Sequence, residues 1–207
     1  GIRCMSKFIY DNKLTDKSVL KIETLSGIKT VSLIFENEVP TGAKVDMGEP
    51  VFAPSLIPVL SDEKEIVDKC VSVGGRMRKI TCVSMGNPHC VIFVPEDFDL
   101  DNFDIEEAGI PIENDPIFPE KTNVEFIKFI DESNLKMRVW ERGSGETFAC
   151  GTGACASAAA ACRAGLCNMD SDITVHLRGG DLKIRYSKSG IEMTGAAANV
   201  FKGTIEI

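Results

Sequence analysis

Apolar and polar residues alternate with a period of two along most of the chain, as they do in strands that bury one face. We expect a strand in each segment that shows this pattern, namely 19–24, 29–36, 79–84, 90–94, 123–130, 135–141, 173–177, 182–186, 191–194 and 203–207. Helical periodicity is rarer, and it occurs at 2–11, in part of 61–70, at 104–108 and at 153–165. The pattern therefore predicts many strands and few helices.

The predicted helix at 153–165 is apolar on every face and consists mainly of Ala, Cys and Ser. A helix without a polar face is normally buried, and its small side chains let the surrounding strands approach closely. Gly165 is expected to cap its C-terminal end, where Arg163 suits the negative end of the helix dipole. This segment is the predicted centre of the core.

The chain contains a loose internal repeat of a helix, a Gly-turned hairpin and a short strand near a Phe. The first copy starts with a helix at Gly1, and the second with a helix at Gly153. Chance similarity between hairpins is the alternative explanation. If the repeat is real, the three positions before Gly1 correspond to residues 150–152. We therefore expect a chain truncated at its front, which also lacks an initiator Met, with a counterpart of Cys150 three residues before Gly1.

Composition and charge exclude several classes of protein. The net charge of −8, with no basic stripe to offset it, disfavours nucleic acid and anionic membranes as partners. No apolar run is long enough to span a bilayer, and the start has no signal-peptide pattern. We therefore expect a cytoplasmic protein.

The eight cysteines are expected to be reduced, because the chain is large and well supplied with core residues. No two of them have C-x-x-C spacing, and His89 and His176 are the only histidines, so we expect no zinc site and no other metal. Most of the cysteines should be small buried apolar residues.

One cysteine stands apart from the others. Cys150 follows a Gly-rich loop and precedes Gly151, Thr152 and Gly153 at the start of the buried helix. Free amide groups and the positive end of the helix dipole should converge beside its sulfur. We expect them to lower the pKa of Cys150 and to bind a carboxylate. A Gly-rich turn can also serve packing alone.

Two further loop edges carry polar residues. Asn87 and His89 flank a Pro that interrupts a strand, and Asn123 starts another strand. Each is compatible with an ordinary turn or strand start. Their value is collective, because they would form a small polar pocket with the Cys150 thiol if the fold brings them together.

These blocks in this order resemble diaminopimelate epimerase over essentially the whole chain. The matching segments are Gly1-Ile2-Arg3-Cys4, Gly86-Asn87-Pro88-His89, Thr122-Asn123-Val124-Glu125-Phe126, Trp140-Glu141-Arg142-Gly143 and Ala149-Cys150-Gly151-Thr152-Gly153. The resemblance implies an α/β (α+β) fold of two pseudo-symmetric domains, each a mixed, mostly antiparallel sheet or barrel wrapped round a central helix. The domains would be 1–42 plus 197–207, with its front missing, and 43–196.

The resemblance also implies roles for individual residues. Cys150 corresponds to a catalytic cysteine, and His89 and Glu141 to residues that tune the protonation of the thiols. The positions that match substrate-binding residues are Asn87, Asn123, Glu141, Arg142, Gly151 and Thr152. Phe201 matches an aromatic residue at a homodimer contact. The family uses no cofactor, and pyridoxal phosphate is not needed.

The activity implied is conversion of LL-diaminopimelate to meso-diaminopimelate, a precursor of lysine and peptidoglycan. Inverting a stereocentre requires one group that removes the α-hydrogen and another that returns a proton to the opposite face. The family uses two cysteines for this, and Cys4 is no substitute because it lies inside its helix. We therefore expect residues 1–207 alone to be inactive.

Two alternative enzymes stay open at this point. One is a racemase or epimerase of the same fold, such as proline racemase, that acts on another amino acid. Arg142 favours a substrate with a second carboxylate, which a guanidinium binds in bidentate fashion. The other is a cysteine hydrolase in which Cys150 is the nucleophile and His89 the base. An inactive fragment is the non-enzymatic alternative.

Overall fold

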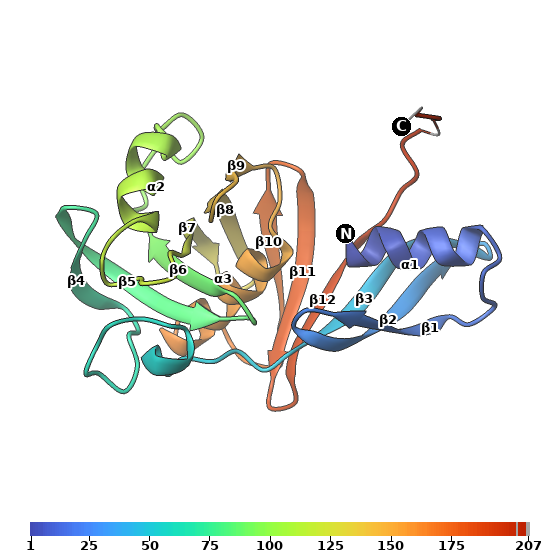
Figure 1. The fold of residues 1–207 in the computed structure, drawn as a ribbon, viewed down its shortest axis with the longest axis horizontal. Helices are drawn as coiled ribbons and strands as arrows, with labels where there is room; N and C mark the ends of the chain where they lie inside the picture. Colours follow the sequence, from blue (N-terminus) through green and yellow to red (C-terminus); the bar gives the residue numbers. More distant parts are fainter. Residues whose placement is uncertain (202, 206–207) are drawn as a thin grey trace.

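The computed structural model describes residues 1–201 and 203–205, and its strands form one open sheet (Figure 1). The strand order is β1-β2-β3-β12-β11-β10-β8-β7-β6-β5-β4, with β9 paired to β8 off this path. The strands are β1 (Val19–Thr24), β2 (Gly27–Glu36), β3 (Val39–Gly48), β4 (Lys69–Val73), β5 (Arg76–Ser84), β6 (Pro88–Phe93), β7 (Asn123–Asp131), β8 (Asn134–Glu141), β9 (Gly145–Thr147), β10 (Asp172–Leu177), β11 (Gly180–Ser187) and β12 (Gly190–Ala196).

Neighbouring strands along this path are antiparallel, except that β6 pairs with β7 and β8 with β10 in parallel. The predicted mixed, mostly antiparallel sheet with few helices is therefore confirmed as an α+β fold. The sheet does not close into a barrel among the described residues, since β1 and β4 lie at its two ends.

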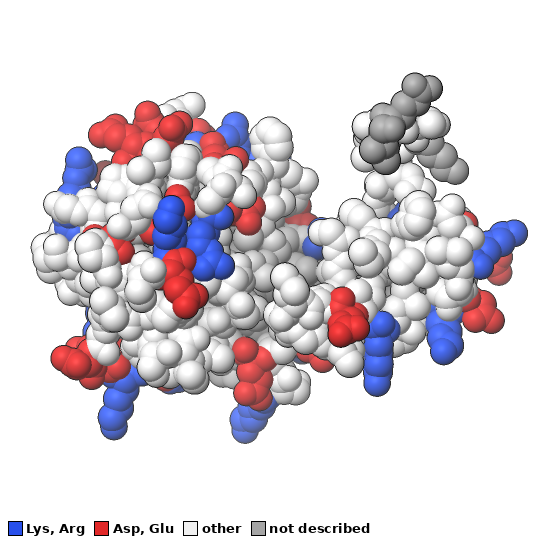
Figure 2. Space-filling model, in the orientation of Figure 1, with Lys and Arg blue, Asp and Glu red and all other residues white. Residues whose placement is uncertain are grey.

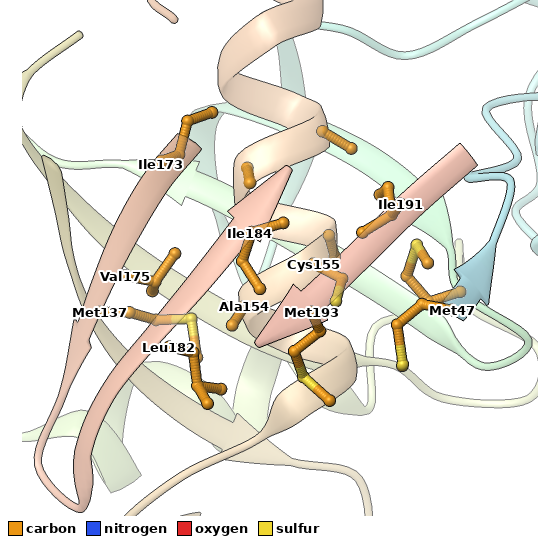
Figure 3. Close-up of a cluster of buried hydrophobic side chains, with 14 of the residues drawn as sticks. Met47, Met137, Ala154, Cys155, Ile173, Val175, Leu182, Ile184, Ile191 and Met193 are labelled. Atoms are coloured by element: carbon orange, nitrogen blue, oxygen red, sulfur yellow. The ribbon is translucent and has the colours of Figure 1, made fainter. Parts of the chain in front are cut away.

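Helix α3 (Gly151–Arg163) lies inside the curve of the sheet, as its composition predicts (Figure 1). All its residues from Gly153 to Ala161 are buried. Side chains of several surrounding strands pack on it, among them Met137, Leu182, Ile184 and Met193 (Figure 3). Its Ala and Cys residues leave room for these larger side chains, so the core combines small side chains from the helix with large side chains from the strands.

A second helix covers the opposite face of the sheet. Helix α2 (Ile105–Glu113) packs on β7 and β8. Alternation along β7 assigns its two faces, because Val124 and Phe126 belong to the core beneath α2 whereas Ile127 belongs to the core around α3. Glu125 has the same parity as Ile127 and so faces α3. Residues of β7 on this face, and not those on the opposite face, can therefore contact the start of α3.

Most predicted elements are confirmed, with small shifts in their ends. Helix α1 (Ile2–Asp11) has the predicted bounds, and so does β1. Helix α3 starts at Gly151, two residues earlier than predicted, and α2 runs past Pro111 to Glu113. A Pro is unfavourable inside a helix, yet Gly74 and Trp140 pack against α2 and hold this turn in place.

Two predictions along the chain are wrong, and three strands were missed. No helix forms within 61–70. Ile66 is buried there, and its carbonyl oxygen accepts a hydrogen bond from Cys82 N at 2.9 Å instead of from a following helical residue. Strands β3, β4 and β9 were not predicted as strands, since their pairing partners are distant in sequence or supplied by a short turn. The strand predicted at 203–207 is absent at 203–205, and 206–207 lie outside the described residues.

The two predicted domains share the sheet. Helix α1 packs on β2 and β3, whereas α3 is enclosed by the strands from β5 to β12. Strand β3 pairs with β2 on one side and β12 on the other, so the predicted boundary between 42 and 43 falls inside a strand. A division into 1–42 plus 197–207 and 43–196 thus stays a proposal, with β3 as the element that joins the parts.

Charged side chains of both signs are spread over the surface (Figure 2). On the face shown, acidic residues gather over α2, whose first turn carries Glu106 and Glu107. Within the described part of the chain, no helix has the length and apolar character needed to cross a membrane.

Candidate active site

Cys150 lies where the loop after β9 meets the start of α3. It is the N-cap residue, with an extended backbone, and its thiol is 5% exposed. The first intrahelical hydrogen bond runs from Ala154 N to Cys150 O at 3.0 Å. The amides of Gly151, Thr152 and Gly153 precede that bond, so they are available to the sulfur or to an anion, as predicted.

The predicted direction of the Cys150 pKa is wrong. Burial raises the pKa of the Cys150 thiol to about 12, and the negative charge of Glu125 contributes to the rise. The Thr152 hydroxyl and the Gly153 amide act in the opposite direction but do not compensate. Loss of hydration therefore outweighs the helix start at this position. Cys150 rests as a thiol, which suits a group that gives a proton.

A chain of polar contacts starts at Cys150. Its Sγ lies 3.5 Å from Thr152 Oγ1, and Asn87 Nδ2 donates to the same oxygen at 3.4 Å. Asn87 Oδ1 is 3.1 Å from His89 Nε2, and His89 Nδ1 is 2.6 Å from Glu125 Oε1. The structure thus brings together Asn87 and His89, Glu125, and Cys150 from three separate segments of the sequence.

His89 and Glu125 form a fully buried pair, with both side chains 0% exposed. Burial raises the pKa of Glu125, while the contact with His89 lowers it. Glu125 was quoted above only within a motif and was not singled out as a site residue. The signal that could have identified it is a charged residue at a strand position whose same-face neighbours are apolar.

Asn123 and Arg142 meet beside this chain. Asn123 Nδ2 donates to Pro88 O at 2.8 Å, and Asn123 Oδ1 accepts from Arg142 N at 2.9 Å. The buried amide therefore ties the start of β6 to the end of β8. The Arg142 side chain is exposed, and its Nη1 donates to Glu120 O at 2.9 Å. Its guanidinium is therefore held by the loop that carries Glu120.

Glu141 is half-buried at the end of β8, where Thr147 Oγ1 donates to its Oε1 at 2.5 Å. Its charge contributes to the raised pKa of both Cys150 and Glu125, so it belongs to the same electrostatic environment. The turn that follows Glu141 is anchored to α2 by hydrogen bonds. The Glu113 carboxylate accepts them from Trp140 Nε1 at 2.8 Å and from Gly143 N at 3.0 Å. Sequence reasoning did not identify this anchor.

The first turn of α1 and the start of α3 both approach Met193 on β12. Arg3 Nη1 lies 3.7 Å from Met193 Sδ, and a Cβ on Gly151 would lie 3.1 Å from that sulfur. The starts of α1 and α3 therefore flank one side chain on β12. This agrees with the internal repeat, which aligns these two helix starts.

Phe201 is 86% exposed. The structure contains no group of three or more His, Cys, Asp or Glu side chains arranged for a metal within the residues it describes. Every cysteine in the chain is free.

Residues 81–200 match the family model described as diaminopimelate epimerase. The chain is 45% identical over 218 residues to diaminopimelate epimerase of Agathobacter rectalis, with 100% of this chain and 74% of the relative covered. It is 47% identical over 209 residues to diaminopimelate epimerase of Methanococcus maripaludis strain C6, with the same coverage.

Solved structures share the fold at much lower sequence identity. A probable proline racemase from Agrobacterium radiobacter K84 superimposes with a TM-score of 0.74 at 10% identity, over 99% of this chain and 66% of that one. A hydroxyproline epimerase from Agrobacterium vitis gives a TM-score of 0.67 at 11% identity, over 93% and 61%. The chain spans slightly less than two thirds of the length of each.

Proposed function

The chain belongs to the diaminopimelate epimerase family and is an isomerase, and from this premise we propose that it interconverts LL- and meso-diaminopimelate without a cofactor. The observation that carries the proposal is the position of Cys150, a buried thiol among the free amides at the start of α3. The product would be a precursor of lysine and peptidoglycan.

In the proposed reaction, Cys150 acts on one face of the substrate α-carbon. A second group removes the α-hydrogen from the opposite face as a proton, and the C–H electron pair stays on the substrate as a carbanion. The Cys150 thiol then gives its proton to that carbon and becomes a thiolate. In the reverse direction the thiolate removes the proton, so the two groups exchange protonation states at each turnover.

The carbanion is stabilised through the α-carboxylate. The amides of Gly151, Thr152 and Gly153 are placed to hold this group, and they favour the additional negative charge that develops as the proton leaves. The buried surroundings strengthen each of these interactions, because water competes poorly there. The raised pKa of Cys150 supports its role as the group that starts as acid.

The opposing group would act from the side of α1. The first turn of α1 and the start of α3 both approach Met193, so a group at the start of α1 would lie near the start of α3. We propose that a second thiol acts from this side, at the position that the internal repeat pairs with Cys150. Two groups on opposite faces are the direct means of inverting a stereocentre.

The remaining residues would recognise the substrate. We propose that Arg142 binds the distal carboxylate, since its side chain is exposed next to the site. Asn87 and Asn123 would supply amide contacts, and Glu141 would bind an ammonium group. His89 and Glu141 would also tune the thiols. A cytoplasmic homodimer with Phe201 in its contact completes the proposal.

The cysteine hydrolase alternative receives no support from the geometry. A nucleophilic cysteine needs a base within hydrogen-bond reach. Both ring nitrogens of His89 are occupied, by Glu125 and Asn87, and the contact of Cys150 is with Thr152. A racemase for another amino acid is the remaining competitor, and a comparison of substrates decides it.

Replacing the thiol tests the proposal directly. In the native gene product, Cys150→Ser should lower kcat for LL-diaminopimelate by about 100- to 10,000-fold, the usual contribution of a positioned acid or base. Cys155→Ala is the matched control, because this buried cysteine lies one turn further along α3 and should retain most of the activity. Equal activity of Cys150→Ser and the native protein would refute the role of Cys150, and faster turnover of proline would favour the competitor.

A further inference from the structure

Glu125 is a buried carboxylate that the proposed reaction does not use. It lies on the face of β7 that packs against α3, where its neighbours in register are Val91 on β6 and Val139 on β8. Both neighbours are buried and apolar, and an apolar residue at 125 would continue the same core. A charged group in such a place is costly unless it serves a purpose other than stability.

The hydrogen bonds of Glu125 do not offset this cost fully. Oε1 is 2.6 Å from His89 Nδ1, but Oε2 is buried without a hydrogen-bond partner among the residues that the structure describes. A buried acceptor left unpaired is destabilising. A neutral residue of similar size would avoid this penalty, so stability alone does not account for the carboxylate.

The start of α3 is shaped around this carboxylate. A Cβ on Gly153 would lie 2.8 Å from Glu125 Oε1 and 3.3 Å from Cys150 Cβ, so the carboxylate and the thiol flank one empty position. A side chain at 153 would displace Glu125 or Cys150. The second Gly of the Cys-Gly-Thr-Gly segment is therefore needed for the two groups to approach each other.

Glu125 also determines the orientation of the polar chain that ends at Cys150. Asn87 Oδ1 can only accept a hydrogen bond, so its contact with His89 Nε2 places that ring nitrogen as the donor, and the contact of His89 Nδ1 with Glu125 Oε1 holds the ring in this orientation. This turns the amide of Asn87 so that Nδ2 donates to Thr152 Oγ1, and the Thr152 hydroxyl proton is left for the sulfur.

We propose that Glu125 is a positioning residue for Cys150: through His89 and Asn87 it orients the Thr152 hydroxyl toward the sulfur, while its own carboxylate beside the sulfur opposes ionisation of the thiol between turnovers. The inference rests on the proposed role of Cys150. The titratable groups that face Cys150 are Glu125 from β7, Glu141 from the end of β8 and Cys155 from α3 itself. Glu125 is the larger of the two carboxylate contributions.

The test measures the protonation of Cys150 without requiring turnover. The folded protein is treated with iodoacetamide from pH 7 to pH 10, and the modified cysteines are identified by peptide mass spectrometry. Glu125→Gln keeps the size of the side chain but removes its charge, so alkylation of Cys150 at pH 8 should become at least about fivefold faster. Glu125→Asp keeps the charge and should stay much closer to the native rate.

Two controls separate a local effect from general loosening. Cys4 and Cys70 are exposed and should react at unchanged rates in every variant. Glu113→Gln removes another buried carboxylate, which bonds Trp140 and Gly143, and should leave the Cys150 rate unchanged. Should Glu125→Gln fail to fold, the Glu125→Asp rate still decides, because a purely structural role predicts faster alkylation there too.

An unchanged Cys150 rate in folded Glu125→Gln would overturn the inference. So would a rate increase shared by Cys4 and Cys70, since that would indicate unfolding. Neither outcome bears on whether Cys150 is catalytic, which the activity of Cys150→Ser decides separately.

Discussion

At the scale of single residues, the site is governed by desolvation. The start of α3 offers Cys150 several donors, and the sequence shows them clearly. The sequence does not show that the thiol is 5% exposed or that the Glu125 carboxylate lies beside it. Helix-end effects are modest and short in range, whereas burial acts on the whole charge of a thiolate. A motif therefore locates a reactive group but does not give its protonation state.

The same reasoning predicts how Glu125 affects stability. Its pKa in the folded protein is raised, chiefly by burial, so the folded state holds this proton more tightly than the unfolded state. This contribution to stability is present below the unfolded pKa of about 4.3 and is lost as the pH rises through the folded pKa. Glu125→Gln cannot lose a proton there. Its free energy of unfolding should therefore improve relative to the native protein as the pH rises from 4 to 8.

Urea denaturation of both proteins at several pH values measures that difference. Glu113→Gln is again the matched variant, because it removes a buried carboxylate elsewhere. A stability difference between Glu125→Gln and the native protein that shrinks with rising pH would show that the fold favours the ionised carboxylate, contrary to the account.

At the scale of elements, the paired strands β3 and β12 join the two parts of the sheet. A Cβ on Gly42 would lie 2.8 Å from the carbonyl oxygen of Gly195 across this pair. Backbone atoms in a sheet cannot move aside as a flexible side chain can. Gly42→Ala should therefore lower the free energy of unfolding by about 1–3 kcal/mol, the usual cost of overpacking. Gly1→Ala, which meets open space, is the control.

Hydrogen exchange locates the effect of Gly42→Ala. Amides of β3 and β12 should lose protection before those of β7 and β8, which lie on the far side of the sheet. Unchanged protection of β3 and β12, or stability equal to that of Gly1→Ala, would mean that the sheet accommodates the added Cβ beside Gly195 O without loss of stability.

Local pattern predicted the elements whose partners lie nearby. The alternation of β1 and the small-residue run of α3 both fixed their position closely. Strand β3 was missed because Gly42 and Ala43 give little alternation, and its pairing with β12 joins residues about 150 positions apart. The segment 61–70 was misjudged because its charges resemble a helix face, while Ile66 is buried by a distant strand.

Prediction of the site followed the same division. Motifs identified Cys150, Asn87 and His89 because each stands at a turn. Glu125 was passed over because it sits inside a strand, and only the register of β6, β7 and β8 shows that it faces α3. When the role of a residue depends on which face of the sheet it occupies, that role can be recognised only after the pairing of the strands is known.

At the scale of the whole molecule, the fold brings two helix starts to one place. Helices α1 and α3 belong to different parts of the sheet, and the N terminus of the chain lies at the end of α1 near β11 and β12 (Figure 1). Met193 is flanked by both first turns. In the proposed reaction, a group at each helix start would act on one face of the substrate carbon, as inversion of a stereocentre requires.

The most direct test of the central claim follows the α-hydrogen in the native gene product. The protein is incubated with LL-diaminopimelate in D₂O. The products are separated by chiral chromatography, and their deuterium content is measured by mass spectrometry. The proposed two-base reaction should give one deuterium at the inverted carbon of meso-diaminopimelate, and this labelled product should be lost in Cys150→Ser. Inversion that retains the substrate hydrogen, or labelled product formed at the native rate by Cys150→Ser, would contradict it.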